Sequence, residues 1–156
     1  MKKVIAFSLT LVVFCLSNAI AQQYKMAAGL GLDVGDGPTL VGPTIKYFFK
    51  DNHAIEGEVL FGSPSVFIQA FYQYHQTIPG AKGLQWYAGG GPSLQLASGS
   101  SYFYLRPMVG LDYKLSETPL ALSFDWRPFI YLGNTYGGSR FTAPRFGLGV
   151  KYILTK

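Results

Sequence analysis

From residue 24 onward, apolar and polar residues alternate along most of the chain. The clearest alternation lies in residues 120–132, where Phe124 and Trp126 stand between Ser123, Asp125 and Arg127. Successive side chains of a β-strand point to opposite faces, so a repeat of two residues is typical of a strand with one apolar and one polar face. No segment shows a sustained apolar repeat of 3.6 residues, and the sequence therefore predicts an all-β protein.

Eight alternating segments predict eight strands. They cover residues 24–34, 39–49, 54–62, 65–77, 84–96, 102–115, 120–132 and 141–154, with turn residues such as Asp36-Gly37-Pro38 between them. Each segment reaches the roughly 9–11 residues that a tilted strand needs to cross hydrocarbon. An even number of consecutive antiparallel strands can close without leaving an edge. The pattern predicts an eight-stranded antiparallel up-and-down transmembrane β-barrel with short loops.

Ten charged side chains share the face that is predicted to point into this barrel. They are Lys46, Glu56, Glu58, Arg106, Asp112, Lys114, Asp125, Arg127, Arg145 and Lys151. The interior of an eight-stranded barrel has little room, and an isolated buried charge is costly, so we interpret the set as a plug of salt bridges. An ion conduit needs the same charges with continuous water between them, and this alternative stays open at the level of sequence.

The composition agrees with a surface that faces lipid. Only 13% of the residues are charged, whereas a soluble domain typically carries about 25%. Lys2 and Lys3 precede an apolar run at residues 4–16 and a small-x-small site at Ala19-Ile20-Ala21, which predicts a cleaved signal peptide over residues 1–21 and a barrel domain over residues 22–156. Loss of the two lysines leaves 11 basic against 8 acidic residues, with no basic cluster, so we expect no nucleic-acid partner.

The single cysteine, Cys15, lies inside the predicted signal peptide. The mature chain is therefore expected to have no disulfide and no thiol chemistry. A lipoprotein signal is the alternative interpretation of Cys15, although the preceding Phe14 is bulky where such signals usually carry a small residue.

With its export signal, its meander of short strands and its alternating closing segment at residues 145–154, the chain resembles the small eight-stranded outer-membrane barrels of the OmpA/OmpX type. The resemblance covers the whole mature chain. It implies an integral, porin-like protein of a Gram-negative cell envelope, with both termini in the periplasm. It also implies that outer-membrane lipids are the main partner and that no cofactor is bound. Aromatic residues near the predicted periplasmic ends, among them Trp86 and Tyr113, suit a membrane–water boundary.

Histidines and glycines are the candidates for catalysis or ligand binding. His53 and His75 are both expected at or near surface turns, and two histidines without cysteine make a poor metal site. The glycines of Gly29-Leu30-Gly31 and Gly89-Gly90-Gly91 match no phosphate-binding spacing, and no helix is expected after them. We expect the inward-phase glycines to make room for long inward side chains; they are Gly29, Gly31, Gly89, Gly91, Gly147 and Gly149. No catalytic, metal-binding or cofactor-binding residue is therefore predicted.

Five prolines lie inside predicted strands, where proline removes a ladder hydrogen bond. They are Pro43, Pro92, Pro107, Pro128 and Pro144, and all five are predicted to face outward in the half of the barrel away from the termini. One interpretation is a set of local bulges. The other is a weakened wall through which a lipid-like molecule passes sideways.

Three functions follow from this pattern. The leading hypothesis is a non-catalytic structural barrel, or an accessory subunit beside another outer-membrane protein or complex. The alternative is a narrow pore or a lateral path that binds or transports a small apolar or lipid-like molecule. A lipid-modifying enzyme would need an acid–base–nucleophile set at the outer rim, and no histidine is expected there.

Overall fold

The computed structural model describes residues 24–133 and 140–155. The predicted signal peptide, residues 1–21, lies outside the described residues. Within the described part of the chain, no helix is long and apolar enough to cross a membrane.

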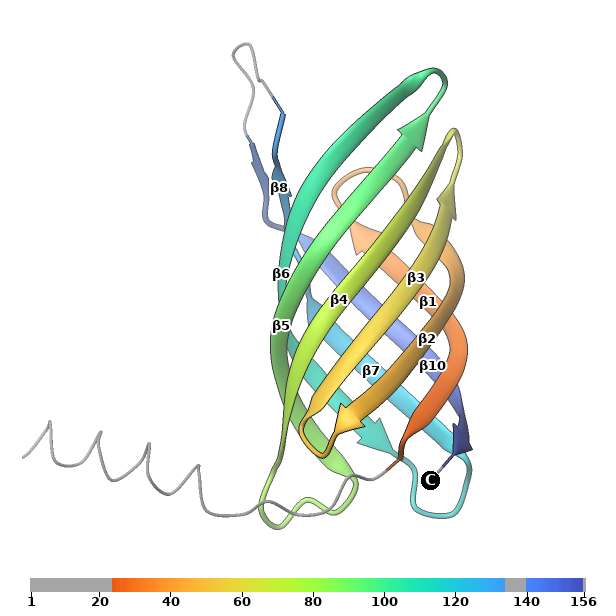
Figure 1. Ribbon diagram of the computed structural model, residues 1–156, viewed down its shortest axis with the longest axis vertical. Coiled ribbons are helices and arrows are strands. Elements are labelled where there is room, and N and C mark those ends of the chain that lie inside the picture. The colour runs from red at the N-terminus through yellow and green to blue at the C-terminus, as the bar shows by residue number, and fades with distance from the viewer. Residues whose placement is uncertain (1–23, 134–139, 156) are drawn as a thin grey trace, which may run out of the picture.

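The described residues form one antiparallel sheet that curls into a barrel (Figure 1). Its strands are β1 (Met26–Gly35), β2 (Leu40–Lys50), β3 (His53–Gly62), β4 (Ser65–Thr77), β5 (Leu84–Ala97), β6 (Ser100–Lys114), β7 (Leu120–Trp126), β8 (Phe129–Tyr131), β9 (Phe141–Thr142) and β10 (Arg145–Thr155). Each strand from β1 to β6 pairs with its neighbours in sequence, and the pairing of β1 with β10 closes the sheet. The predicted closed eight-stranded meander is confirmed.

The seventh and eighth wall strands differ from the prediction, because a proline interrupts each of them. Pro128 separates β7 from β8, and Pro144 separates β9 from β10. Val109 pairs with Trp126 on one side of the first interruption and Leu105 with Ile130 on the other, in one continuous register. Pro107 therefore stands opposite Pro128, and since neither proline has an N–H, the ladder lacks a donor on both strands at this point.

The interruption between β9 and β10 is of another kind. The register of β9 on β8 is shifted by one residue from that of β10 on β7, so the wall bulges at Ala143-Pro144. Beyond the bulge, β9 forms the edge of the sheet and pairs only with β8 among the described residues. In Figure 1 the paired strands β8 and β9 rise beside the rim, apart from the β1–β2 turn.

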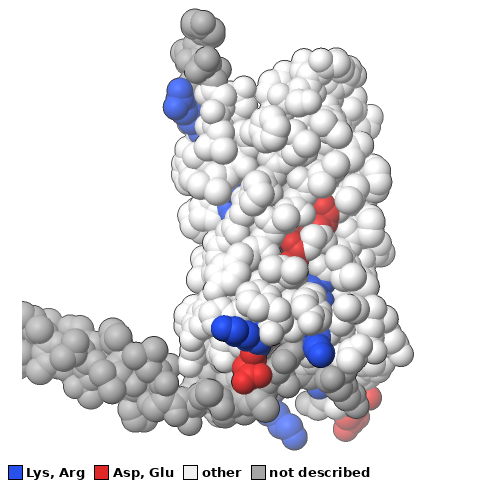
Figure 2. All heavy atoms as spheres, viewed as in Figure 1, with Lys and Arg blue, Asp and Glu red and all other residues white. Residues whose placement is uncertain are grey.

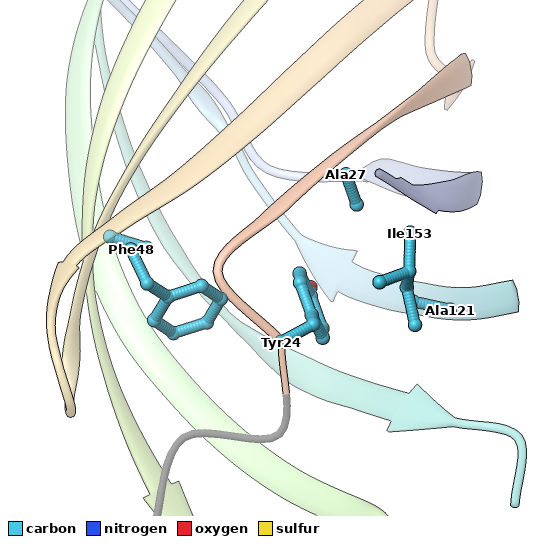
Figure 3. Close-up of a cluster of buried hydrophobic side chains, with 6 residues drawn as sticks. Tyr24, Ala27, Phe48, Ala121 and Ile153 are labelled. Atoms are coloured by element: carbon cyan, nitrogen blue, oxygen red, sulfur yellow. The ribbon is translucent and has the colours of Figure 1, made fainter. Parts of the chain in front are cut away.

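Three apolar clusters fill parts of the interior. The cluster at the end of the barrel where the chain enters and leaves, here called the terminal end, contains Tyr24, Ala27, Phe48, Ala54, Ala121 and Ile153 (Figure 3). A second cluster, of Leu40, Leu60, Phe67 and Phe129 with Tyr104 against it, lies toward the opposite, distal end. The third contains Phe71, Tyr87 and Met108. Apolar side chains therefore occupy the lumen above and below its charged residues.

Candidate functional site: the charged lumen

The buried charges of the described residues are balanced. Alternation along the strands places five carboxylates and five cations in the interior: Asp33, Glu56, Glu58, Asp112 and Asp125 with Lys46, Arg106, Arg127, Arg145 and Lys151. Nine of the ten predicted lumen residues are in this set. The tenth, Lys114, is the last residue of β6 and is partly exposed. Sequence reasoning missed Asp33, although it shares the inward phase of Gly31 on β1.

Near the terminal end, Lys46 lies between two carboxylates. Its Nζ is 2.8 Å from Asp112 Oδ2 and 3.2 Å from Glu56 Oε2. Lys151 pairs with the other oxygen of Glu56 at 2.6 Å, and the Tyr24 hydroxyl donates to Asp112 at 2.9 Å. The cations and carboxylates here hold one another in place across four wall strands.

In the middle of the lumen, Arg127 bridges Glu58 and Asp125. Its Nη1 donates to Glu58 Oε2 at 2.8 Å, and Nε and Nη2 both donate to Asp125. The Tyr87 hydroxyl also donates to Asp125, at 2.5 Å. A guanidinium that meets a carboxylate through two parallel hydrogen bonds is among the stronger ion-pair geometries, and burial leaves little water to compete.

Toward the distal end, Asp33 receives two arginines. Arg106 Nη1 lies 2.5 Å from Asp33 Oδ2, and Arg145 Nη2 lies 2.7 Å from Asp33 Oδ1. Arg145 also donates to the main-chain oxygens of Asp36 and Pro38, at 2.7 and 3.0 Å, and so fastens the β1–β2 turn to the lumen. The Arg106 guanidinium lies 3.8 Å from the ring centroid of Phe129, which places the distal apolar cluster directly against the charges.

Glycines in β10 leave space for this network. A Cβ added to Gly147 would collide with the Arg127 guanidinium, and one added to Gly149 would collide with Ser123 Oγ. At these two positions the expected role of the glycines holds. Gly89 is different, because a Cβ there would meet the backbone of β4, so this glycine permits close strand approach.

The two histidines differ from each other. His53 is partly exposed, and its Nδ1 lies 2.6 Å from the Tyr72 hydroxyl. The prediction that His75 lies on a surface turn is wrong: the side chain is fully buried, and its ring stacks on Tyr87 at 4.8 Å. In the described residues, no group of three or more histidine, cysteine or acidic side chains is arranged to hold a metal ion.

The outward face of the barrel is apolar. Trp126 is 38% exposed while the next residue, Arg127, is 2% exposed, and the same contrast recurs along β10. Figure 2 shows one face of the barrel as largely uncharged; the charged side chains that show lie mostly toward the terminal end, with smaller red and blue patches at mid-height and one blue side chain near the distal end. The charged lumen and the apolar exterior are thus opposite sides of the same strands.

The prolines do not form one uniform belt. Pro43 and Pro92 are exposed within intact strands, and β5 and β6 stay paired in register past Pro92 and Pro107. Pro144 is exposed at the bulge between β9 and β10. Pro128 lies between the lumen residues Arg127 and Phe129 and so keeps the outward phase, but it is buried at the break between β7 and β8.

Comparisons with known proteins agree with this geometry. The structure resembles the crystal structure of the N-terminal β-barrel domain of Pseudomonas aeruginosa OprF, with 19% identity, a TM-score of 0.63, and coverage of 85% of this chain and 98% of that one. It also resembles Neisserial surface protein A, with 16% identity, a TM-score of 0.53, and coverage of 83% and 94%. The fold is that of the small eight-stranded outer-membrane barrels. No family model matches the chain, and no curated protein sequence does so either.

Proposed function

We propose that the mature chain is a non-catalytic integral barrel of the bacterial outer membrane, whose lumen is closed by its charge network and which serves as a structural or accessory component. One observation carries the proposal. The described lumen holds equal numbers of buried cations and carboxylates in mutual contact, while the same strands expose apolar side chains outward. A soluble barrel would bury the apolar face, and an open pore would need water between the charges.

Aromatic side chains at the terminal end of the barrel support an orientation in the membrane. Phe49, His53, Tyr72, Tyr74 and Trp86 form a series of ring contacts on the outside of β2–β5 near the terminal end. Amphipathic rings favour the membrane–water boundary. With the termini in the periplasm, this boundary is the periplasmic one. The expected partners are outer-membrane lipids and, in an accessory role, another outer-membrane protein packed on the apolar wall.

Cell fractionation and planar-bilayer recording together test this proposal. The chain is expected in the outer-membrane fraction, with altered gel mobility unless it is boiled. Reconstituted protein is expected to give no regular conductance steps at neutral pH. Recovery as a soluble periplasmic protein would contradict the membrane assignment, and steady single-channel conductance would contradict the closed lumen.

The wall interruptions favour a second candidate function, a lateral path for a small apolar or lipid-like molecule. Pro107 and Pro128 leave the ladder without donors on both strands, and the neighbouring β8–β9 hairpin ends in an edge strand. Proteoliposomes that contain this barrel are then expected to take up an apolar fluorescent probe faster than protein-free vesicles. The variant with both prolines replaced by valine is expected to lose the difference. Equal uptake in all three samples would exclude the path.

A further inference from the structure

Two hollows lie next to each other on the outside of β2–β5. The larger has a volume of about 560 Å³ and is almost entirely apolar. Small residues form its floor, since Gly57 on β3 stands directly opposite Ala70 on β4, and Pro92 on β5 also lines it. Larger side chains, including Ile45 and Tyr72, line it as well. The result is a groove in a wall that is otherwise covered by projecting apolar side chains.

The second hollow is polar and lies at the turn between β2 and β3. It has a volume of about 360 Å³ and is lined by Lys50, Asp51, Asn52, His53 and Tyr74. Lys50 and Asp51, consecutive in the chain, give the lining of this hollow one cation and one carboxylate. The two hollows meet where His53 of the polar one contacts the Tyr72 hydroxyl of the apolar one, at 2.6 Å.

Their arrangement follows the polarity of one membrane leaflet. The ring contacts of Phe49 and His53 with Tyr72 lie between the hollows, at the level assigned to the membrane boundary. From Lys50 to Ile45 the strand advances five residues, or roughly 16 Å at about 3.3 Å per residue, which is roughly 12 Å along the membrane normal at a strand tilt of about 40°. One leaflet of a hydrocarbon core about 30 Å thick measures about 15 Å. The apolar groove therefore lies in hydrocarbon, and the polar hollow lies among headgroups.

We propose that this surface binds one glycerophospholipid of the periplasmic leaflet that carries a zwitterionic headgroup, with an acyl chain in the apolar groove. Lys50 is placed to bind the phosphate and Asp51 to bind the headgroup ammonium, so both charges of the hollow are matched. A singly anionic headgroup leaves Asp51 without a partner and is disfavoured. The inference rests on the proposed membrane location of the barrel.

The test is native mass spectrometry of the full mature barrel, released from bilayers that contain equal amounts of phosphatidylethanolamine and phosphatidylglycerol. Gly57→Leu fills the groove, and a Cβ at this position has a single close neighbour, Ile45 Cγ2 at 3.8 Å, so the variant is expected to fold. Lys50→Glu reverses the charge that meets the phosphate. Val150→Leu enlarges an outward side chain of β10, away from the groove, by one methylene and serves as the control for substitution on the lipid-facing wall.

The wild type and Val150→Leu are expected to retain one phosphatidylethanolamine per barrel. Gly57→Leu and Lys50→Glu are expected to reduce that retention about tenfold, equivalent to about 1.4 kcal/mol. Unchanged retention in Gly57→Leu, equal retention of the two lipids, or a second copy of the chain in place of lipid would each overturn the inference. If Gly57→Leu and Lys50→Glu retain phosphatidylethanolamine as the wild type does, while the barrel still fractionates with the outer membrane, only this inference is lost and the proposed function stands.

Discussion

The guanidinium of Arg106 donates a 2.6 Å hydrogen bond to the main-chain oxygen of Arg127. In a regular ladder that oxygen would accept from the N–H of Arg145, its neighbour on the next strand. The bulge at Ala143 instead directs the Arg145 N–H to the Ala143 oxygen at 2.9 Å, while the Arg127 N–H still donates to Arg145 at 3.0 Å. A lumen side chain therefore donates the hydrogen bond that the bulge removes from the ladder. In this way the charge network also stabilises the backbone of the wall.

Arg106 is expected to be among the most sensitive positions in the lumen. Arg106→Met removes the bonds to Asp33, Gln69 and the Arg127 oxygen together. Breaking a buried ion pair typically costs about 3–5 kcal/mol in free energy of unfolding. Reversible urea unfolding in lipid vesicles measures this cost, with Lys114→Met, at the partly exposed end of β6, as the control. A decrease of under about 1 kcal/mol in the free energy of unfolding of Arg106→Met would contradict a stabilising role for these bonds.

Depth on the outer wall should set the cost of an added charge. Phe124 lies in the interior of β7, and Phe124→Arg is expected to lower the free energy of unfolding by about 2–4 kcal/mol. Tyr113 lies outward near the terminal end of β6, and Tyr113→Arg is expected to cost about 0–1 kcal/mol. Urea titrations of both variants in vesicles give the comparison. Equal costs would mean that the two positions do not differ in membrane depth.

Space at Gly147 is expected to be essential for the network. Gly147→Ala places a methyl group into the Arg127 guanidinium, which must then leave Asp125 or Glu58. We expect this variant to unfold at a clearly lower midpoint concentration of urea than the wild type. Gly57→Ala, whose Cβ would meet only Ile45 Cγ2 at an ordinary contact distance of 3.8 Å, is the matched control and is expected to leave the midpoint unchanged or slightly raised. Similar midpoints for the two variants would argue against a tightly packed network.

Hydrogen exchange should locate the weak part of the wall. Amides beside the Pro107–Pro128 pair, including those of Met108 and Phe129, are expected to exchange faster than the amide of Leu122, which lies nearer the terminal end in the regularly paired part of β7. The Pro128→Val variant restores a donor and should slow the exchange of Met108. Pro43→Val, in an intact strand, should change little. Uniform protection along β6 in the wild type would mean that the wall accommodates both prolines without loss.

The period-two pattern predicts most of the wall because each strand records its two environments in alternate residues. It does not predict pairing inside the lumen, since Arg106 and Asp33 are 73 residues apart and meet only after the barrel closes. The burial of His75 has a simpler signal in the sequence. Nearness to a turn predicts a surface position, but His75 shares the phase of the buried Gln73, and phase decides which side of the wall a side chain faces. Proline predicts the strand breaks at Pro128 and Pro144. It does not predict that the register continues across the first break and shifts by one residue at the second, because that depends on pairing with neighbouring strands.

The claim that apolar faces point into lipid is tested most directly by the two native tryptophans, Trp86 and Trp126, which are 37% and 38% exposed on the outer wall. Fluorescence of the mature barrel is measured in vesicles of brominated phospholipid, with Trp86→Phe and Trp126→Phe used to separate the two signals. Both are expected to be quenched by bromine and shielded from aqueous iodide. Trp126, the seventh residue of β7, should respond to deeper bromines than Trp86, the third residue of β5. Quenching by iodide without quenching by brominated lipid would contradict the account.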